Sequence, residues 1–401
     1  EIVMVEKGMN PAALKKINRD KVYKYIYQQK EVSKQQIVQD LHLGLSTVSQ
    51  NLNELEQEGR IRRDRYFQST GGRKAQIIQI VEDDRISIGL GILKDMFHIV
   101  AVNLYGEAIA TETIELSYKS DDVYYDTLAK EVEQFIQNQH YDTHKIEGIS
   151  IATQGIISLD GTSMTYGNIM GNIKMKLSDF SSRLPYPCHL EHDSKSAADL
   201  ELWNHPQLDS AIVILLNPNL GGAIITHHEV HVGHHMRSGL IEHMCIDPAG
   251  PDCYCGHHGC LETYCSANAL KAAANMPIKE FFNTLHTEES PNLQQIWKGY
   301  LDHLAFAISN LNLVIDCPVI ISGYLAPYFQ KEDMKYLIDQ INEHSPFQME
   351  EDQILVGTHG QYTPAIGAAL YYVKQSLELL NQISQSTCYP QNFHKTQVLF
   401  L

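Results

Sequence analysis

The sequence predicts a small basic head of helices and two strands, followed by an acidic α/β body with two similar lobes. Three observations support this fold class. Residues 1–75 contain 14 Lys and Arg against 9 Asp and Glu, whereas the remainder contains 17 against 39. Short helical patterns near the N-terminus are separated by a glycine-containing turn. Clusters of strands then occur twice, from about residues 86 and 211, with helical stretches between them.

The bulk composition is that of a globular protein. A chain of 401 residues with 43% hydrophobic and 20% charged residues predicts two or three domains. The sequence has neither a run of about 18 apolar residues nor the pattern of a signal peptide, so we expect no membrane-spanning helix and no secretion. Eight cysteines, four of them in or near a metal-binding pattern, fit a reducing cytoplasm better than a disulfide scaffold.

The head contains the pattern of a helix-turn-helix. Apolar residues at near-helical spacing predict a first helix within residues 10–30. Ser33 is a good N-cap for a second helix, and Ser46 for a third helix that Gly59 stops. Two short helices joined by such a turn predict that the second of the pair binds DNA bases. The alternative is a small helical subdomain without this role.

Polar residues are expected on the outer face of that third helix, where they would contact base edges and phosphates: Ser46, Thr47, Ser49, Gln50 and Asn53. Strand patterns at 60–63 and 77–80 predict a wing. Between them, two glycines precede Arg73 and Lys74, a flexible cationic segment suited to a minor groove. A plain interdomain linker is the alternative.

The body shows alternating strand and helix patterns. Strands are predicted at 86–92, 98–102, 108–114, 148–152, 211–216, 222–225 and 319–323, and helices at about 122–138, within 264–315 and from 365 toward 383. We place the DNA-binding head and linker at 1–82, the first lobe at 83–195 and the second at 196–401. The C-terminal helix is expected to pack back on the first lobe.

The sequence predicts a metal site between His243 and Glu262. Its donors follow the spacing His-x9-Cys-x-Cys-x4-Cys: His243, Cys253, Cys255 and Cys260. Three thiolates and one imidazole complete a tetrahedral structural zinc and leave no position for a reactive water. Intervening glycines allow the chain to fold back tightly. The alternative is a set of ordinary buried thiols or a disulfide pair.

The run Cys-Tyr-Cys-Gly-His-His-Gly-Cys-Leu-Glu at 253–262 resembles the zinc motif of the ROK family, which includes repressors and sugar kinases. The Ser-Thr-Val-Ser turn at 46–49 and Asn18-Arg19 are similar to the corresponding positions of the family's repressors. The resemblance implies a winged helix-turn-helix before a two-lobed, actin-like, hexokinase-type body with a structural zinc beside a sugar pocket. It also implies that the segment with Arg73 contacts operator DNA.

The phosphate loops of the family's kinases are poorly matched. The first loop resembles Asp-x-Gly-x-Thr in kinases, but residues 89–93 read Gly-Leu-Gly-Ile-Leu. The second is glycine-rich in kinases, but residues 216–222 include Pro218, which has no N–H to donate. Because phosphoryl transfer depends on positioning and charge stabilisation, we expect no kinase activity and assign no catalytic residue.

The family's sugar pocket is better matched. Glu191-His192-Asp193 resembles the family's Glu-Asn-Asp, which implies ligand contacts for His192 and Asp193. The resemblance extends the pocket to Asn168, His243 and Glu262. Leu240, however, stands where relatives have Glu. Either Glu242 replaces that carboxylate, or the ligand differs from glucose, binds weakly or is not a sugar.

The favoured interpretation is a cytoplasmic repressor of carbohydrate-metabolism genes, controlled by a sugar or sugar derivative. It would bind double-stranded operator DNA as a homodimer or tetramer, because a helix-turn-helix reads paired half-sites. The alternatives are an ATP-dependent sugar kinase with a DNA-binding head, and a repressor controlled by a protein partner. The state of the phosphate loops favours the repressor over the kinase.

Overall fold

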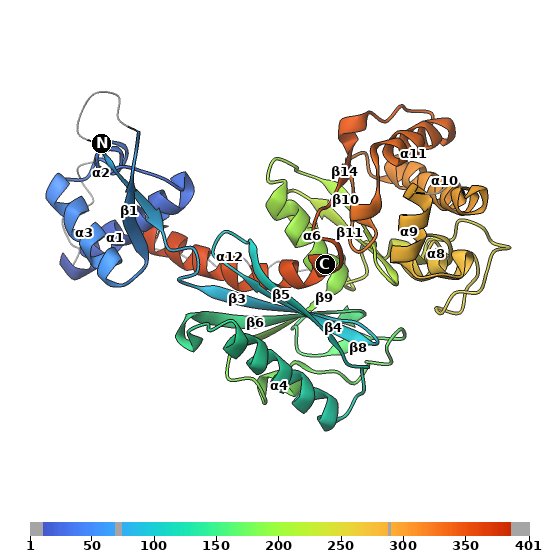
Figure 1. The fold of residues 1–401 in the computed structure, drawn as a ribbon, viewed down its shortest axis with the longest axis horizontal. Helices are drawn as coiled ribbons and strands as arrows, with labels where there is room; N and C mark the ends of the chain where they lie inside the picture. Colours follow the sequence, from blue (N-terminus) through green and yellow to red (C-terminus); the bar gives the residue numbers. More distant parts are fainter. Residues whose placement is uncertain (1–10, 69–73, 288–289, 386–401) are drawn as a thin grey trace, which may run out of the picture. The chain divides into compact units, whose positions relative to one another are not determined.

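The computed structural model describes residues 11–68, 74–287 and 290–385, and the chain divides into two compact units (Figure 1). The first unit contains residues up to Arg85 and those from Val373, and the second runs from Ile86 to Tyr372. The long helix α12 (Thr363–Gln385) begins in the second unit and continues into the first.

Three helices and one antiparallel strand pair form the N-terminal part of the first unit, in this order: α1 (Pro11–Gln29), α2 (Lys34–Asp40), α3 (Leu45–Gln57), β1 (Ile61–Tyr66) and β2 (Gln76–Ile80). The expected helices and strands are thus present. Their core is apolar, with Ile26, Ile37 and Leu52 fully buried. Burial of such side chains contributes about 1.5–3 kcal/mol each.

The ends of the short helices follow local capping chemistry. Ser33 caps α2 as expected: Ser33 Oγ accepts from the Gln36 N–H at 3.3 Å, and Gln36 Oε1 accepts from the Ser33 N–H at 2.8 Å. The expectation that Ser46 caps α3 was wrong. Extended Gly44 is the N-cap, and its carbonyl accepts from the Val48 N–H at 3.0 Å, so Ser46 already lies in the first turn.

The second unit contains two five-stranded sheets with the same connectivity. The first has the order β5-β4-β3-β6-β9, and the second has the order β12-β11-β10-β13-β14. In each, the first strand in sequence is central, two antiparallel strands extend to one edge, and two parallel strands extend to the other. This repetition confirms the expected pair of similar lobes.

The strands of the first sheet are β3 (Ile86–Ile92), β4 (Met96–Val102), β5 (Ala108–Glu115), β6 (Ile146–Thr153) and β9 (Cys188–His192). Those of the second are β10 (Ala211–Leu216), β11 (Leu220–Thr226), β12 (Glu229–His231), β13 (Val319–Ser322) and β14 (Ile354–Val356). Strands β3 and β10 are buried along their whole length, as expected for central strands covered on both faces. A small pair, β7 (Ile156–Ile157) and β8 (Met164–Tyr166), follows β6.

Helices cover both sheets (Figure 1). On the first, α4 (Asp122–Asn138) lies on one face and α12 on the other. On the second, α6 (Asp193–Asn204) packs against one face. The other face carries a large apolar core built with α7 (Glu262–Cys265), α8 (Ala267–Ala274), α9 (Ile278–Thr287), α10 (Pro291–Val314) and α11 (Lys331–His344).

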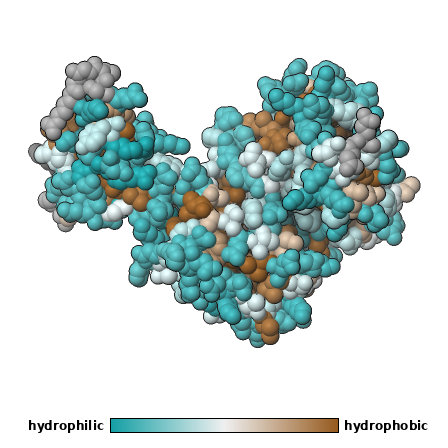
Figure 2. All heavy atoms as spheres, viewed as in Figure 1, coloured by the Kyte–Doolittle hydropathy of each residue, from teal (hydrophilic) through white to brown (hydrophobic). Residues whose placement is uncertain are grey.

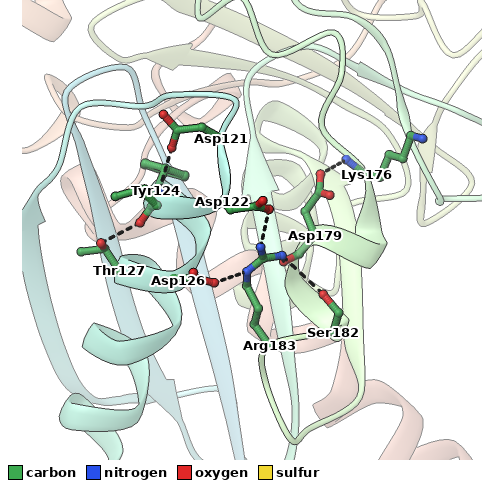
Figure 3. Close-up of polar contacts among 10 residues, drawn as sticks. Asp121, Asp122, Tyr124, Asp126, Thr127, Lys176, Asp179, Ser182 and Arg183 are labelled. Atoms are coloured by element: carbon green, nitrogen blue, oxygen red, sulfur yellow. Dashed lines mark hydrogen bonds and ion pairs between the residues drawn. The ribbon is translucent and has the colours of Figure 1, made fainter.

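An exposed polar cluster joins α4 to α5 (Leu177–Ser181) in the first lobe (Figure 3). Arg183 donates to Asp122 and Asp126 on α4, at 2.6 Å in each case. Asp121 caps α4 by accepting from the Tyr124 N–H at 2.9 Å. Ion pairs this exposed contribute little stability, about 0–1 kcal/mol each.

The face shown in Figure 2 is largely hydrophilic, with apolar residues in smaller patches. Within the described part of the chain, no helix has an apolar stretch long enough to cross a bilayer.

Candidate metal centre and ligand pocket

The four expected metal ligands converge in the second lobe. Their donor atoms, from His243, Cys253, Cys255 and Cys260, all lie within 4.8 Å of one another. Cys255 Sγ is 3.6 Å from Cys260 Sγ, and Cys253 Sγ is 3.9 Å from His243 Nδ1. Zn–S bonds of about 2.3 Å at tetrahedral angles would hold two sulfurs about 3.8 Å apart. The four donors therefore have a spacing suited to one tetrahedral cation.

Backbone turns produce this convergence. Gly256 and Gly259 have φ of +88° and +64°, a region that side chains with a Cβ disfavour. A Cβ on Gly259 would also overlap the carbonyl of Asp247. The Cys253 N–H donates to the His257 carbonyl at 2.8 Å, closing the turn that carries two of the thiols.

The donor set fits a zinc ion chemically as well as geometrically. All the cysteines in the described residues are free thiols, so the disulfide alternative is not adopted. Burial raises the pKa of the Cys260 thiol to about 12. A cation at the centre would oppose that shift, since a thiol that coordinates a metal is deprotonated. His243 and the three cysteines would hold the ion and leave no open position.

A cavity of about 340 Å³ lies beside this centre and brings together four of the five expected ligand-binding residues: Asn168, His192, Asp193 and His243. Asn168 donates to the Tyr166 hydroxyl at 2.8 Å. The His243 ring packs edge to face on Tyr254, with centroids 5.2 Å apart, and both rings line the cavity. His243 thus belongs to the wall of the cavity and to the metal centre.

Asp193 stands at the start of α6 and is only 8% exposed. One carboxylate oxygen, Oδ1, accepts from the Ser194 N–H at 2.7 Å and from its hydroxyl at 3.1 Å. His192 Nε2 is 3.7 Å from the same oxygen, while buried His192 Nδ1 has no hydrogen-bond partner. Burial lowers the pKa of His192, so the neutral ring can either donate or accept toward a ligand.

Glu262 occupies a different position from the expected one. It is absent from the lining of the cavity, and both of its oxygens bind the protein. One accepts from Asn219 Nδ2 at 2.8 Å and the other from the Leu220 N–H at 2.6 Å. Glu262 therefore fixes the start of β11 behind the cavity. Burial raises the pKa of Glu262 to about 7.

Glu242 lines the cavity where sequence reasoning left its role open. It is 6% exposed, and its Oε2 has no hydrogen-bond partner. Leu240, which stands where relatives have Glu, lines the cavity too. The carboxyl group that reaches the cavity therefore comes from a residue two positions further along the chain, in the turn Ile241–His243. A buried carboxylate oxygen without a partner is costly, and a ligand hydroxyl would satisfy it.

Sequence reasoning missed two further lining residues, Gln154 and Arg237. Gln154 follows β6 and is 5% exposed, yet its side-chain amide has no partner among the described residues. Arg237 is exposed and also lacks a partner there. Neither belongs to a recognisable motif, so only the fold places them at the pocket.

A second cavity, of about 370 Å³, adjoins the first and is lined by both loops expected to hold phosphates in kinases. In those loops and in the adjoining start of α8, backbone N–H groups already donate to protein acceptors at five positions: Leu93, Asn217, Leu220, Ala267 and Asn268. Pro218 has no N–H. A Cβ on Gly89 would overlap the Ala365 carbonyl on α12, so this packing leaves no room there for the kinase carboxylate.

In the head, the expected DNA-contacting residues lie along α3. Ser46, Gln50 and Asn53 are exposed, whereas Thr47 and Ser49 are half-buried. Ser49 Oγ donates to the Leu45 carbonyl at 2.7 Å. Lys74 is exposed, and Arg73 lies outside the described residues.

Three glutamates, two on α3 and one at its C-cap, form ion pairs with nearby cations. Glu54 pairs with Lys15 at 2.6 Å, Glu58 with Arg19 at 2.7 Å, and Glu56 with Arg63. Arg63 on β1 also donates to Asn53 Oδ1 at 3.0 Å, which sequence reasoning did not foresee. Arg63 thus orients one of the expected base-contacting side chains.

The duplicated sheets with adjoining cavities define a two-lobed protein of the actin-like, hexokinase-type class. The chain belongs to the ROK family, whose sequence model matches residues 85–375. It is 25% identical over 362 residues to the xylose repressor of Caldicellulosiruptor bescii, spanning 84% of this chain and 90% of that protein.

Two solved structures share the fold. A ROK family transcriptional regulator, described as a homologue of the Escherichia coli MLC protein, superposes with a TM-score of 0.65 at 19% identity. That alignment covers 93% of this chain and all of the other. A ROK glucokinase from Streptomyces griseus, solved with glucose and AMPPNP, has a TM-score of 0.62 at 18% identity, over 71% of this chain and 98% of its own.

Proposed function

We propose that this chain is a cytoplasmic transcriptional repressor whose operator affinity is set by a saccharide bound beside the metal centre. The observation that carries the proposal is the cavity beside His243, where Asp193 and Glu242 are buried and Glu242 Oε2 has no protein partner. Polyhydroxylated ligands supply the donors that such oxygens need. The repressor name of the Caldicellulosiruptor bescii relative, which aligns over most of both chains, supports the same role.

The head is proposed to be a winged helix-turn-helix, with α3 in the major groove and the β1–β2 connection as the wing. Exposed Ser46, Gln50 and Asn53 would contact base edges, while Thr47, Ser49, Lys74 and Arg73 would contact the backbone or adjacent groove. Such a head reads paired half-sites, so we expect a homodimer on DNA. Ultracentrifugation with and without operator would measure this.

The metal centre is proposed to hold structural zinc on His243, Cys253, Cys255 and Cys260. When bound, zinc would supply no reactive water, since the four protein donors fill its coordination sphere. Its contribution would be to hold the His243 ring against the cavity.

A sugar kinase is the second candidate, because Asp193 lies where both cavities meet and a glucokinase shares the fold. The occupied backbone N–H groups and the packing at Gly89 argue against it. We therefore expect no ATP-dependent phosphorylation of hexoses or pentoses in a coupled assay. Turnover that disappears in Asp193→Asn would contradict this.

The central experiment selects bound duplexes from a random DNA library with the full-length protein. Enrichment of a two-fold symmetric site is expected, and Gln50→Ala or Asn53→Ala should relax its sequence preference. A panel of hexoses, pentoses, amino sugars and their phosphates is then tested for release of that site. Failure to enrich any sequence would overturn the repressor proposal. Enrichment of a site that no compound releases would contradict only the proposal that a saccharide controls the repressor.

A further inference from the structure

We propose that the second cavity is a subsite for a second sugar ring, so that the ligand of this chain is a disaccharide or comparable glycoside spanning both cavities. This inference rests on the proposed function, because it assumes that the first cavity binds a sugar. It differs in assigning a role to the space where a kinase of this fold would hold its nucleotide.

The two cavities meet at two buried polar side chains. Gln154 and Asp193 line both, and they are 5% and 8% exposed. The Gln154 amide has no partner among the described residues, and Asp193 uses only Oδ1 in the protein contacts described above. A ligand that crosses the junction could form hydrogen bonds with both the Gln154 amide and the Asp193 carboxylate. A single ring in either cavity would leave the side of the junction that faces the other cavity hydrogen-bonded only to water.

The size of the cavities is consistent with a two-ring ligand. At about 340 and 370 Å³, each lies near the lower limit of small-molecule sites, which span about 300–1,000 Å³. Taken together they reach the middle of that range.

The chemistry of the second cavity suits hydroxyl groups. Five carboxamide side chains line it: Gln154, Asn217, Asn219, Asn268 and Gln361. Buried Asn217 uses its oxygen to accept from the Tyr324 N–H at 2.9 Å, and its N–H₂ group makes no further bond in the described protein. A carboxamide both donates and accepts, as does a sugar hydroxyl. Half-buried Tyr324 adds an aromatic wall.

The same lining disfavours a phosphate. Two exposed cations, Lys94 and Lys271, are matched by two carboxylates, Asp95 and Asp193. His98 also lines the cavity, but burial lowers its pKa to about 4, so it carries no charge near neutral pH. With no net positive charge, and with the five backbone N–H groups named above already bonded to protein acceptors, the cavity favours a neutral group over a nucleotide or sugar phosphate.

Calorimetry on the full-length protein tests the proposal with matched probes. Glucose, xylose and N-acetylglucosamine are each compared with cellobiose, xylobiose and chitobiose, and glucose 6-phosphate and ATP are included. Asn268→Trp places a bulky ring in the second cavity from an exposed position on α8, and Lys271→Trp does so from the next turn. Asn283→Trp, exposed on α9 and absent from both linings, is the control.

We expect at least one disaccharide to bind tenfold or more tightly than its monosaccharide. Asn268→Trp or Lys271→Trp should remove that advantage and leave monosaccharide affinity unchanged, and Asn283→Trp should alter neither. Three outcomes would overturn the subsite. Every disaccharide could bind no more tightly than its monosaccharide, or the advantage of the disaccharide could survive both Asn268→Trp and Lys271→Trp. The third is that the parent binds ATP or glucose 6-phosphate and the two tryptophan variants lose that binding. Monosaccharide binding would then still support the proposed function, whereas absence of all saccharide binding would contradict both.

Discussion

At the scale of single residues, the metal centre and the pocket are built from adjacent positions. His243 contributes its ring to both, and Glu242, the residue before it, places a buried carboxylate in the cavity. Loss of metal should therefore disturb the ligand site as well as the fold. Such an effect on both would distinguish the proposed centre from a zinc site that only stabilises a loop.

The first prediction concerns zinc. Cys255→Ser should lose the metal and lower the melting temperature. The four donors come together only in the folded chain, so the free energy of metal binding stabilises the folded state. Elemental analysis and thermal unfolding measure the two effects. Cys188→Ser, a half-buried thiol in the first lobe, should keep full zinc content. A full complement of zinc in a well-folded Cys253→Ser/Cys255→Ser double variant would rule out the assignment.

The second prediction concerns Glu242. Burial raises the pKa of Glu242 to about 8, so its carboxyl is largely neutral near pH 7. Glu242→Leu should weaken saccharide binding about five- to hundredfold, because a buried ligand hydroxyl left without its partner costs about 1–3 kcal/mol. Calorimetry with the tightest-binding saccharide measures it. Glu229→Leu, exposed on β12, is the matched control. Unchanged affinity in Glu242→Leu would assign ligand recognition to the other groups of the cavity.

A third prediction concerns pH. Burial lowers the pKa of His98 to about 4, below its ordinary value near 6.5. The unfolded chain then binds more protons between those values, so the stability contributed by neutral His98 is present above pH 6.5 and lost as the pH falls toward 4. By pH 5 the loss is about 2 kcal/mol. Melting temperature should fall less between pH 7 and 5 in His98→Gln than in the parent. Equal falls would show that His98 is not buried neutral.

The role of residues with uncommon metal-binding side chains could be predicted from the sequence. The role of residues with common side chains, which depends on where the fold places them, could not. The four donors proposed to bind zinc converge as the spacing indicated, because three thiols and an imidazole within 18 residues have few other arrangements. Glu262, in contrast, follows the last ligand in sequence but is oriented toward the start of β11. Its contacts depend on a strand 42 residues away, which local spacing does not encode.

At the scale of elements, hydrophobic periodicity predicted the strands and helices, and close packing between them depended on glycines. Helix α12 lies so close to β3 that Gly89 and Gly91 face Ala365. In the sequence, Gly89 was notable only as the missing kinase carboxylate. The structure adds a packing reason for glycine there, since any side chain at 89 would displace the helix.

The fourth prediction follows from that contact. Gly89→Ala should destabilise the second unit by about 1–3 kcal/mol or more, since overpacking forces backbone shifts. Gly299→Ala, within α10 where an added Cβ would meet nothing within 4 Å, should instead stabilise by about 0.5–1 kcal/mol. Chemical denaturation of the two variants measures these opposite signs. A neutral Gly89→Ala would show that α12 is not held against β3.

At the scale of the whole molecule, charge and ligand chemistry are separated along the chain. The basic residues of 1–75 belong to the head, and the acidic excess belongs to the remainder. A ligand can alter operator affinity only through its differential affinity for the DNA-bound and released forms. Ligand sensing and DNA binding should therefore be separable by mutation.

The last prediction tests this separation. Asp193→Ala should keep operator affinity but abolish release by saccharide, because it removes a buried carboxylate at the junction of both cavities. Arg73→Ala should do the reverse: weaker operator binding, a salt dependence shallower by about one unit of slope, and unchanged saccharide affinity. Fluorescence anisotropy at several salt concentrations measures both. Normal release in Asp193→Ala would place the sensing site elsewhere, and parental binding by Arg73→Ala at every salt concentration would reduce its segment to a linker.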